Sequence, residues 1–575
     1  MPLVPLTIPP GVVKPATPLL AKGRYWDANL IRWRSNKLLP VGGWQRTTAT
    51  PLASAVRALL PWRDNNNSRW MMIGCDTKLY ANDGATYTDV TPTAFVPLTG
   101  VGGYGAYNYG ALLYGDDTDG TYPRPASLLD PSAFTWTMDN WGEDVLSVAS
   151  SDGRLFIYHP GDTQAGVVGY STITTISRTS NVVTVTTALD HTFRVGQSVV
   201  IAGVTTASFD GTFTVVSVPT DNTFTYAQSG TNATSSGGTV THTGTPTNNR
   251  GVIVTPERHC VLFGLNGNPR RVGWSDAEDY AEWDFASATN TAGFYDLDTQ
   301  SRIIMATTVR EGTLIWTDDE AWLMQYIGLP YVYSITRIGF GCGLIAPRAF
   351  ATTAGRCIWM SGESFWIYDG GTVRPLRCDV GSYVFDNIDP NEGVRITNGS
   401  ENGLFPEVWF WYPSEGSNVP NKYVVYNYAE DWWTIGTMTR TACAGAGTLS
   451  NPMAADENDD LYYQEIGWTA AGTSLAGDRW VETSSINIQN GNLISHIRQA
   501  ITDSGYGYDS TQITFYSSYT PEGAETVSGP YNPRPSGYTD MRVSGRDFRM
   551  KITATEDAPW SIGEMRVEFM GGGGR

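Results

Sequence analysis

The stretch IGCDTKLYANDG, at Ile73–Gly84, decides the fold of this 575-residue chain. Short apolar runs that contain or end in an aromatic residue alternate in it with turns of Gly, Asp or Asn. The same phrase returns as VASSDGRLFIYHPGD at Val148–Asp162 and as WMSGESFWIYDGG at Trp359–Gly371. Alternating apolar residues between turn formers predict a β-hairpin at each copy.

Looser copies of the phrase extend the pattern along most of the chain. They lie at Ala111–Gly120, Cys260–Asn268, Trp316–Gly328 and Ala455–Gly467. The copies are spaced mostly by about 30 to 60 residues, which is typical of four-stranded propeller blades rather than of sandwich strands. We therefore expect an all-β protein built around a β-propeller of six to eight blades.

The composition agrees with an all-β fold and limits the function. Only 17% of the residues are charged, 62 are glycine, and the formal net charge is −19. A nucleic-acid clamp is excluded because phosphate binding requires clusters of Lys and Arg, and the sequence has none. Two interpretations of the acidity stay open: it keeps the protein soluble, or it forms a surface that repels a polyanion.

Changes in amino-acid composition along the chain divide it into five predicted segments. A Ser/Thr-rich stretch with hardly any charge or tryptophan interrupts the hairpin phrases, and we expect it to fold on its own as an insertion in a propeller loop. The last segment has sandwich-like strands and is expected to assemble with the N-terminal arm. The segments are 1–49 (Pro-rich arm and first strands), 50–170 (propeller, first part), 171–246 (inserted small β domain), 247–480 (propeller, second part) and 481–575 (C-terminal β-sandwich-like platform with a flexible Gly-rich tail).

Neither export nor metal binding is indicated. The N-terminus lacks a basic region followed by an apolar core, and no run of 18 apolar residues occurs, so we expect no Sec export and no membrane segment. The cysteines lie far apart without a CxxC pair, which favours buried reduced thiols over a metal site or disulfide staples. They are Cys75, Cys260, Cys342, Cys357, Cys378 and Cys443.

No catalytic constellation is evident, so we expect no enzyme and no catalytic, cofactor-binding or metal-binding residues. The glycine-rich Gly100–Gly110 lacks the Lys-Ser/Thr of a phosphate loop. Ser150–Gly153 lacks one residue of the Asp box of sialidases. Twenty tryptophans either fill the space between blades or stack on sugar rings. Five histidines are isolated in the sequence: His159, His191, His242, His259 and His496.

Three segments together resemble one protein family. They are PLTIPPG…KGRYWDANLIRWRSNKLLPVGGWQ (Pro5–Gln45), GNPRRVGWSDAEDYAEWDF (Gly267–Phe285) and RDFRMKITATEDAPWSIGEMRVEF (Arg546–Phe569). They look like tail nozzle proteins of short-tailed bacteriophages, also called tail tubular or packaged-DNA stabilisation proteins. The resemblance covers everything except the insertion, which resembles small β modules of phage virion proteins.

The resemblance implies a structural virion protein that is made and assembled in the bacterial cytoplasm. It implies a ring, usually a homo-hexamer, below the portal and its head-to-tail adaptor, in contact with other tail proteins or fibres. Such a ring continues the channel for double-stranded DNA, retains packaged DNA and conducts it during ejection. The alternatives are a receptor- or glycan-binding tail propeller and a sialidase-like carbohydrate-active propeller. Adsorption fibres usually carry trimeric β-helix or collagen-like repeats, which this sequence lacks.

Two further expectations concern contacts. The apolar side chains of the arm (Leu3, Val4, Leu6 and Ile8) need a cover, which we expect from a neighbouring subunit or the adaptor. The channel wall should be mainly negative, so that DNA slides without sticking. Candidate sources of that charge are the acidic turns Asp116-Asp117, Asp318-Asp319-Glu320 and Asp456–Asp460.

Overall fold

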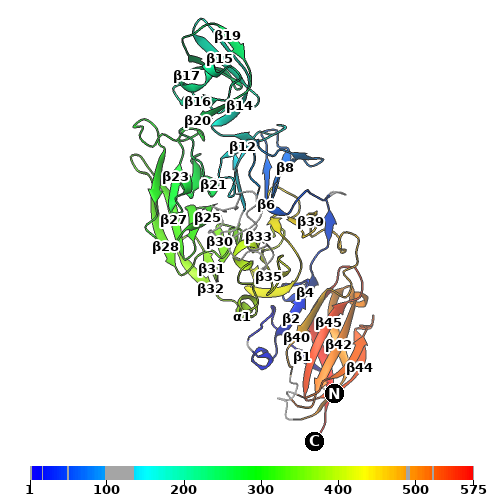
Figure 1. Cartoon of the computed structure of the whole chain (residues 1–575). Coiled ribbons are helices and arrows are strands. Elements are labelled where there is room, and N and C mark those ends of the chain that lie inside the picture. Colours follow the sequence, from blue (N-terminus) through cyan, green and yellow to red (C-terminus); the bar gives the residue numbers. More distant parts are fainter. Residues whose placement is uncertain are drawn as a thin grey trace, which may run out of the picture. The chain divides into compact units, whose positions relative to one another are not determined.

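The computed structural model describes residues 3–15, 17–47, 51–97, 135–486, 493–520 and 523–573. Nearly every element in them is a β-strand, so the all-β prediction is confirmed (Figure 1). The chain forms two compact units. The middle unit is Ala53–Gly343, and the N/C unit combines Met1–Leu52 with Leu344–Arg575.

Four-stranded antiparallel meanders of the propeller-blade type make up most of the middle unit. The first strands of successive blades lie next to each other, β6 beside β10, β10 beside β21 and β21 beside β25. The blades are β6 (Val56–Arg63), β7 (Arg69–Cys75), β8 (Leu79–Asn82) and β9 (Tyr87–Asp89); β10 (Trp136–Trp141), β11 (Asp144–Ala149), β12 (Phe156–Tyr158) and β13 (Gly166–Val167); β21 (Gly251–Val254), β22 (Cys260–Phe263), β23 (Arg271–Trp274) and β24 (Gly293–Asp296); and β25 (Ile303–Val309), β26 (Gly312–Thr317), β27 (Glu320–Gly328) and β28 (Val332–Phe340).

Three more blades belong to the N/C unit, with β29, β33 and β37 side by side. The third of them takes its outer strand from the start of the chain, since β5 pairs with β39. The blades are β29 (Phe350–Thr353), β30 (Arg356–Met360), β31 (Phe365–Tyr368) and β32 (Val373–Leu376); β33 (Asn398–Glu401), β34 (Glu407–Tyr412), β35 (Lys422–Asn427) and β36 (Trp432–Thr437); and β37 (Ala442–Ala444), β38 (Met453–Ala455), β39 (Leu461–Gln464) and β5 (Trp44–Arg46). The short helices α1 (Gly381–Phe385) and α2 (Gly393–Ile396) lie between the first two.

Aromatic side chains fill the space between the blades, which is one of the two roles predicted for the tryptophans. Trp62 and Trp136 belong to one buried cluster between the β6–β9 and β10–β13 blades. Trp141 and Trp283 belong to the next cluster, between the β10–β13 and β21–β24 blades. Burying such large rings is a main source of stability for sheets whose strands are two to nine residues long.

The inserted β domain continues directly from a blade. The last strand of that blade, β13, pairs with β14 through Val167 and Tyr170. The backbone N–H of His242 then donates to the carbonyl of Gly169, so the chain leaves the domain where it entered. A buried cluster from Ile173 to Val240 gives the domain a core of its own. Its strands are β14 (Tyr170–Thr179), β15 (Val182–Thr187), β16 (Ser198–Ala202), β17 (Gly211–Thr220), β18 (Thr223–Ala227), β19 (Ala233–Ser235) and β20 (Thr239–His242).

Strands from both ends of the chain pair with each other in two sheets of the N/C unit. One sheet has the order β3 (Ile31–Arg34), β4 (Lys37–Pro40), β46 (Ser561–Gly571), β41 (Ser495–Tyr506) and β44 (Tyr538–Gly545), with β1 (Leu3–Leu6) on β46. The other has the order β2 (Tyr25–Asn29), β40 (Trp480–Thr483), β45 (Asp547–Ala554), β42 (Thr511–Ser518) and β43 (Thr526–Tyr531). These two sheets hold the strands of the predicted C-terminal sandwich-like platform together with strands from the N-terminal end of the chain.

The Pro-rich arm is covered in part by its own chain. Val4 pairs with Val567, and Leu6 with Met565, along β46. Further on, Val12 is buried and its N–H donates to the carbonyl of Trp433. The sequence alone could not reveal this, because the covering strands lie more than 400 positions away. The side chains of Leu3, Val4, Leu6 and Ile8 are nonetheless exposed or only half-buried, so their cover by another subunit stays a prediction.

Candidate functional site

The histidines are less isolated in space than in the sequence. His242, His259 and His496 each hydrogen-bond a nearby hydroxyl group, as expected of packing residues. His159 and His191, in contrast, line the same cleft, which is described below. The prediction of mutually isolated histidines is therefore wrong for this pair. The cysteines are all free, as expected, and four of the six are buried.

The near-match to an Asp box is a structural turn. Asp152 forms an ion pair with Arg154, with 2.6 Å between Oδ1 and Nε. The second oxygen of Asp152 accepts the backbone N–H of Val96 at 2.9 Å. Its carboxylate is therefore engaged on both oxygens. The glycine-rich Gly100–Gly110 and the turn Asp116-Asp117 lie outside the described residues.

In the two acidic turns that the structure describes, most of the carboxylates are paired with or hydrogen-bonded to other groups of the protein. Glu320 is buried and pairs with Arg337 at 2.8 Å, while Asp318 pairs with Arg302 at 3.2 Å. Asp456 and Asp460 are also buried, and the carboxylate of Asp456 accepts the N–H of Asp460 at 3.1 Å. Glu320, Asp456 and Asp460 are thus corrected as sources of wall charge, because buried carboxylates hold turns rather than face a channel.

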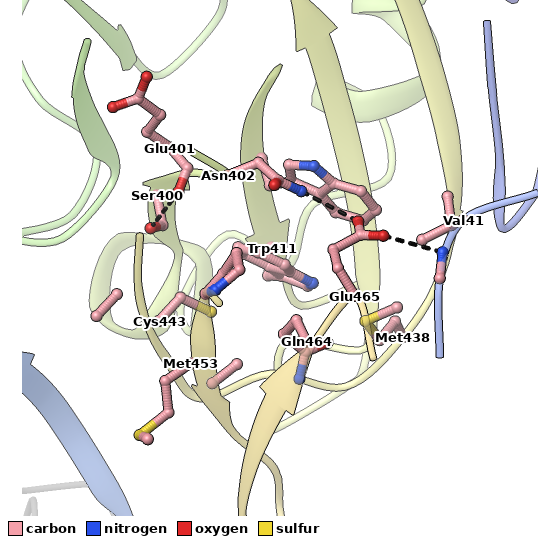
Figure 2. Close-up of a pocket in the computed structure, with 15 residues that line it drawn as sticks. Val41, Ser400, Glu401, Asn402, Trp411, Met438, Cys443, Met453, Gln464 and Glu465 are labelled. Atoms are coloured by element: carbon pink, nitrogen blue, oxygen red, sulfur yellow. Dashed lines mark hydrogen bonds between the residues drawn. The ribbon is translucent and has the colours of Figure 1, made fainter. Parts of the chain in front are cut away.

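A buried ion cluster joins the sandwich to the blades within the N/C unit. Arg32 of β3 donates from Nη2 to Oε2 of Glu407 at 3.0 Å and from Nη1 to Oε2 of Glu465 at 3.1 Å. The three side chains are 2%, 1% and 7% exposed. The carboxylate of Glu465 also accepts hydrogen bonds from the N–H of Gly42 at 3.0 Å and from Nδ2 of Asn402 at 3.1 Å. Figure 2 shows both bonds.

The electrostatics of this cluster favour a fixed structural role. Burial raises the pKa of Glu407, and the charge of Arg32 opposes that rise. Burial alone would lower the pKa of Arg32, yet the two carboxylates hold it above its usual value. The guanidinium also lies 3.7 Å from the ring centroid of Phe405. Each charge is therefore held by its partners, and none is free to transfer a proton.

The cavity beside the cluster is too small for a ligand. Figure 2 shows it between Trp411, Met438, Met453 and Glu465, and its volume is about 30 Å³. This volume is sufficient for about one water molecule. It is a gap in the packing between blades.

A second, larger cavity lies in the middle unit, where the inserted β domain meets the blades. The segment Gly267–Phe285, the strongest phrase of the sequence, supports this contact. Arg194 of the insertion pairs with Asp279 at 3.2 Å, and Gln197 Nε2 donates to Glu282 at 3.4 Å. The segment Gly267–Phe285 therefore holds the inserted domain against the blades. No local feature of the sequence predicted this role.

The cleft enclosed by this contact has a volume of about 500 Å³. Its polar lining residues come from three segments: the loop after β12, the inserted domain and the loop after β23. Nδ1 of His159 lies 2.7 Å from Oδ1 of Asp144. That hydrogen bond, followed by the charges of Asp144, Asp162 and Asp190, raises the pKa of His159. The polar residues of the lining are His159, Asp162, Thr163, Asp190, His191, Thr192, Arg194, Asp221 and Tyr280.

Within the described parts of the chain, no three His, Cys, Asp or Glu side chains are placed to hold a metal ion. Among the same residues, no helix has the length and hydropathy needed to span a bilayer.

Comparison with known proteins identifies no relative by sequence: no family model and no curated protein matches. Among solved structures, the chain is similar to the WD40 domain of Neurospora crassa Pan2, with 7% identity and a TM-score of 0.27 over 58% of this chain and 89% of that one. It is also similar to an exo-β-1,3-galactanase of Phanerochaete chrysosporium in complex with galactose, with 9% identity and a TM-score of 0.24 over 92% of this chain and 100% of that one. Similarities at this level assign no function to the chain.

Proposed function

We propose that this protein is a structural component of a phage tail, a nozzle that assembles as a ring, most simply of six copies. In this role it continues the DNA channel below the portal and adaptor, retains packaged DNA and conducts it during ejection. It acts without catalysis. Its place is the virion, and its partners are further copies of itself, the adaptor and other tail proteins.

The observation that supports this proposal most is the pairing of the two ends of the chain. The N-terminal and C-terminal segments that resemble nozzle proteins lie more than 500 residues apart in the sequence. In the structure they are hydrogen-bonded neighbours: Leu6 pairs with Met565, and Leu38 with Ile562. The two terminal segments that carry the resemblance thus belong to one sheet, as expected if they derive from a single ancestral platform.

The charge of the chain supports passage rather than capture of DNA. With 38 basic and 57 acidic residues, it lacks the excess of cations that draws a protein to phosphate. A wall of low or negative charge repels a duplex over a Debye length of about 8 Å at physiological salt, and so keeps it centred.

We expect the purified protein to bind duplex DNA negligibly at about 0.15 M salt. Fluorescence anisotropy of a labelled duplex, titrated with full-length protein at low and at physiological salt, measures this directly. A basic DNA-binding protein serves as the positive control. Tight binding that weakens steeply with salt would contradict the proposal, because it would reveal many phosphate contacts.

A further inference from the structure

The cleft between the inserted β domain and the blades has the size and position of a ligand site. Its volume of about 500 Å³ lies within the range of about 300–1,000 Å³ that is usual for small-molecule sites, which often form where two domains meet. One wall is the loop around His159 and Asp162, the other is the turn of the insertion around Asp190 and His191, and Tyr280 comes from the blade segment that seats the insertion.

The lining offers both acceptors and donors of hydrogen bonds. Asp190 and Asp221 are exposed, which leaves their carboxylates accessible to a ligand. His159, held through Nδ1 by Asp144, keeps Nε2 for a second bond. Arg194 adds a guanidinium that carries further N–H groups beyond its pair with Asp279.

His191 contributes a mostly buried ring to the wall of the cleft. Its side chain is 7% exposed and stacks on Phe193. Nδ1 accepts the N–H of Phe193 at 3.3 Å, which places the proton on Nε2. That nitrogen has almost no accessible surface, so the ring of His191 shapes the wall of the cleft and does not supply a hydrogen bond to a ligand.

The charges and hydrogen-bonding groups of the lining favour some classes of ligand over others. Several carboxylates face one guanidinium, so an anion is disfavoured by charge. The described residues place no set of three or more ligands for a metal ion, and the polar lining disfavours an apolar molecule. A neutral polyhydroxylated ligand suits such a lining, since each hydroxyl both donates to a carboxylate and accepts from a guanidinium.

We propose that this cleft binds a neutral oligosaccharide, with one or two sugar rings held between the turn at Asp190 and the loop at His159. Asp190 and Asp221 accept hydrogen bonds from sugar hydroxyl groups, Arg194 donates to ring or hydroxyl oxygens, and Nε2 of His159 bonds a further hydroxyl group. This activity goes beyond the conduit function and does not depend on ring assembly.

The test uses the full-length protein on an array of neutral, sialylated and uronate-containing glycans, followed by calorimetric titration of the best neutral ligand. The variants Asp190→Asn and Asp221→Asn should each weaken binding about tenfold or more, because each removes a charged acceptor. Asp298→Asn is the matched control, since Asp298 is exposed in the same unit outside the cleft. It should bind as the parent does.

Equal melting temperatures of the three variants would show that lost binding is not lost folding. The proposal is overturned if no neutral glycan binds, if binding is unaffected by both cleft variants, or if acidic glycans or a polyamine such as spermidine bind in place of neutral sugars. None of these results bears on whether the protein forms a ring, so the two proposals fail independently.

Discussion

Replacing Arg32 with methionine is expected to destabilise the N/C unit by about 3–5 kcal/mol. Methionine keeps an unbranched apolar side chain but leaves Glu407 and Glu465 buried beside each other without the guanidinium that bonds both. Breaking a buried ion pair on one side costs far more than the net value of the pair, because the remaining charge stays desolvated.

Urea unfolding followed by tryptophan fluorescence measures the loss, and Trp409, which donates to Glu407 at 3.1 Å, reports on the site. Arg34→Met is the matched control, since Arg34 lies two residues along the same strand with an exposed side chain. Its effect should stay within about 0.5 kcal/mol. If Arg32→Met were as mild as the control, the cluster would not join the sandwich to the blades.

Replacing Trp136 with alanine is expected to cost about 3–5 kcal/mol in the middle unit. The indole is fully buried between two blades, and its Nε1 donates to the carbonyl of Cys75 at 2.8 Å. The strand beneath it approaches closely because residue 74 is glycine. A Cβ at this position would lie 2.4 Å from Cγ of Trp136.

The same contact predicts a coupling between the two positions. Gly74→Ala alone should cost about 1–3 kcal/mol by overpacking, and most of that cost should vanish in the Trp136→Ala background, where the ring is gone. Thermal unfolding of the two single variants and the double variant gives the coupling energy. Trp70→Ala, a half-buried ring in the same cluster, is the control with a smaller expected loss. Additive effects would show that Gly74 serves some purpose other than admitting the ring.

Local features of the fold were predictable because their cause is local. The phrase at Ile73–Gly84 contains the end of β7 and all of β8, and the phrase at Trp359–Gly371 contains the end of β30 and all of β31. The turn at Ser35-Asn36, between β3 and β4, has the residue types of a tight hairpin turn and the positive φ angles, 51° and 61°, that such a turn requires. Alternation and turn chemistry act over a few residues, so one sequence suffices to detect them.

The sites were not predictable, because they join distant parts of the chain. Arg32 meets Glu407 and Glu465 across 375 and 433 positions. His159 and His191 come together only because the inserted domain packs against the blades, where Arg194 pairs with Asp279 of the segment between β23 and β24. In the sequence each of these residues is a lone charge or a lone histidine. Nothing within a window of ten residues distinguishes them from surface side chains.

Electron microscopy of the purified full-length protein, and of virions that carry it, tests the central claim most directly. The account predicts closed rings in which successive copies contact each other. Each ring has an axial opening wide enough for a DNA duplex, about 20 Å across, and in virions the ring lies on the tail axis. Particles that remain monomeric at high concentration, together with virions that place the protein on peripheral fibres rather than on the axis, would contradict it.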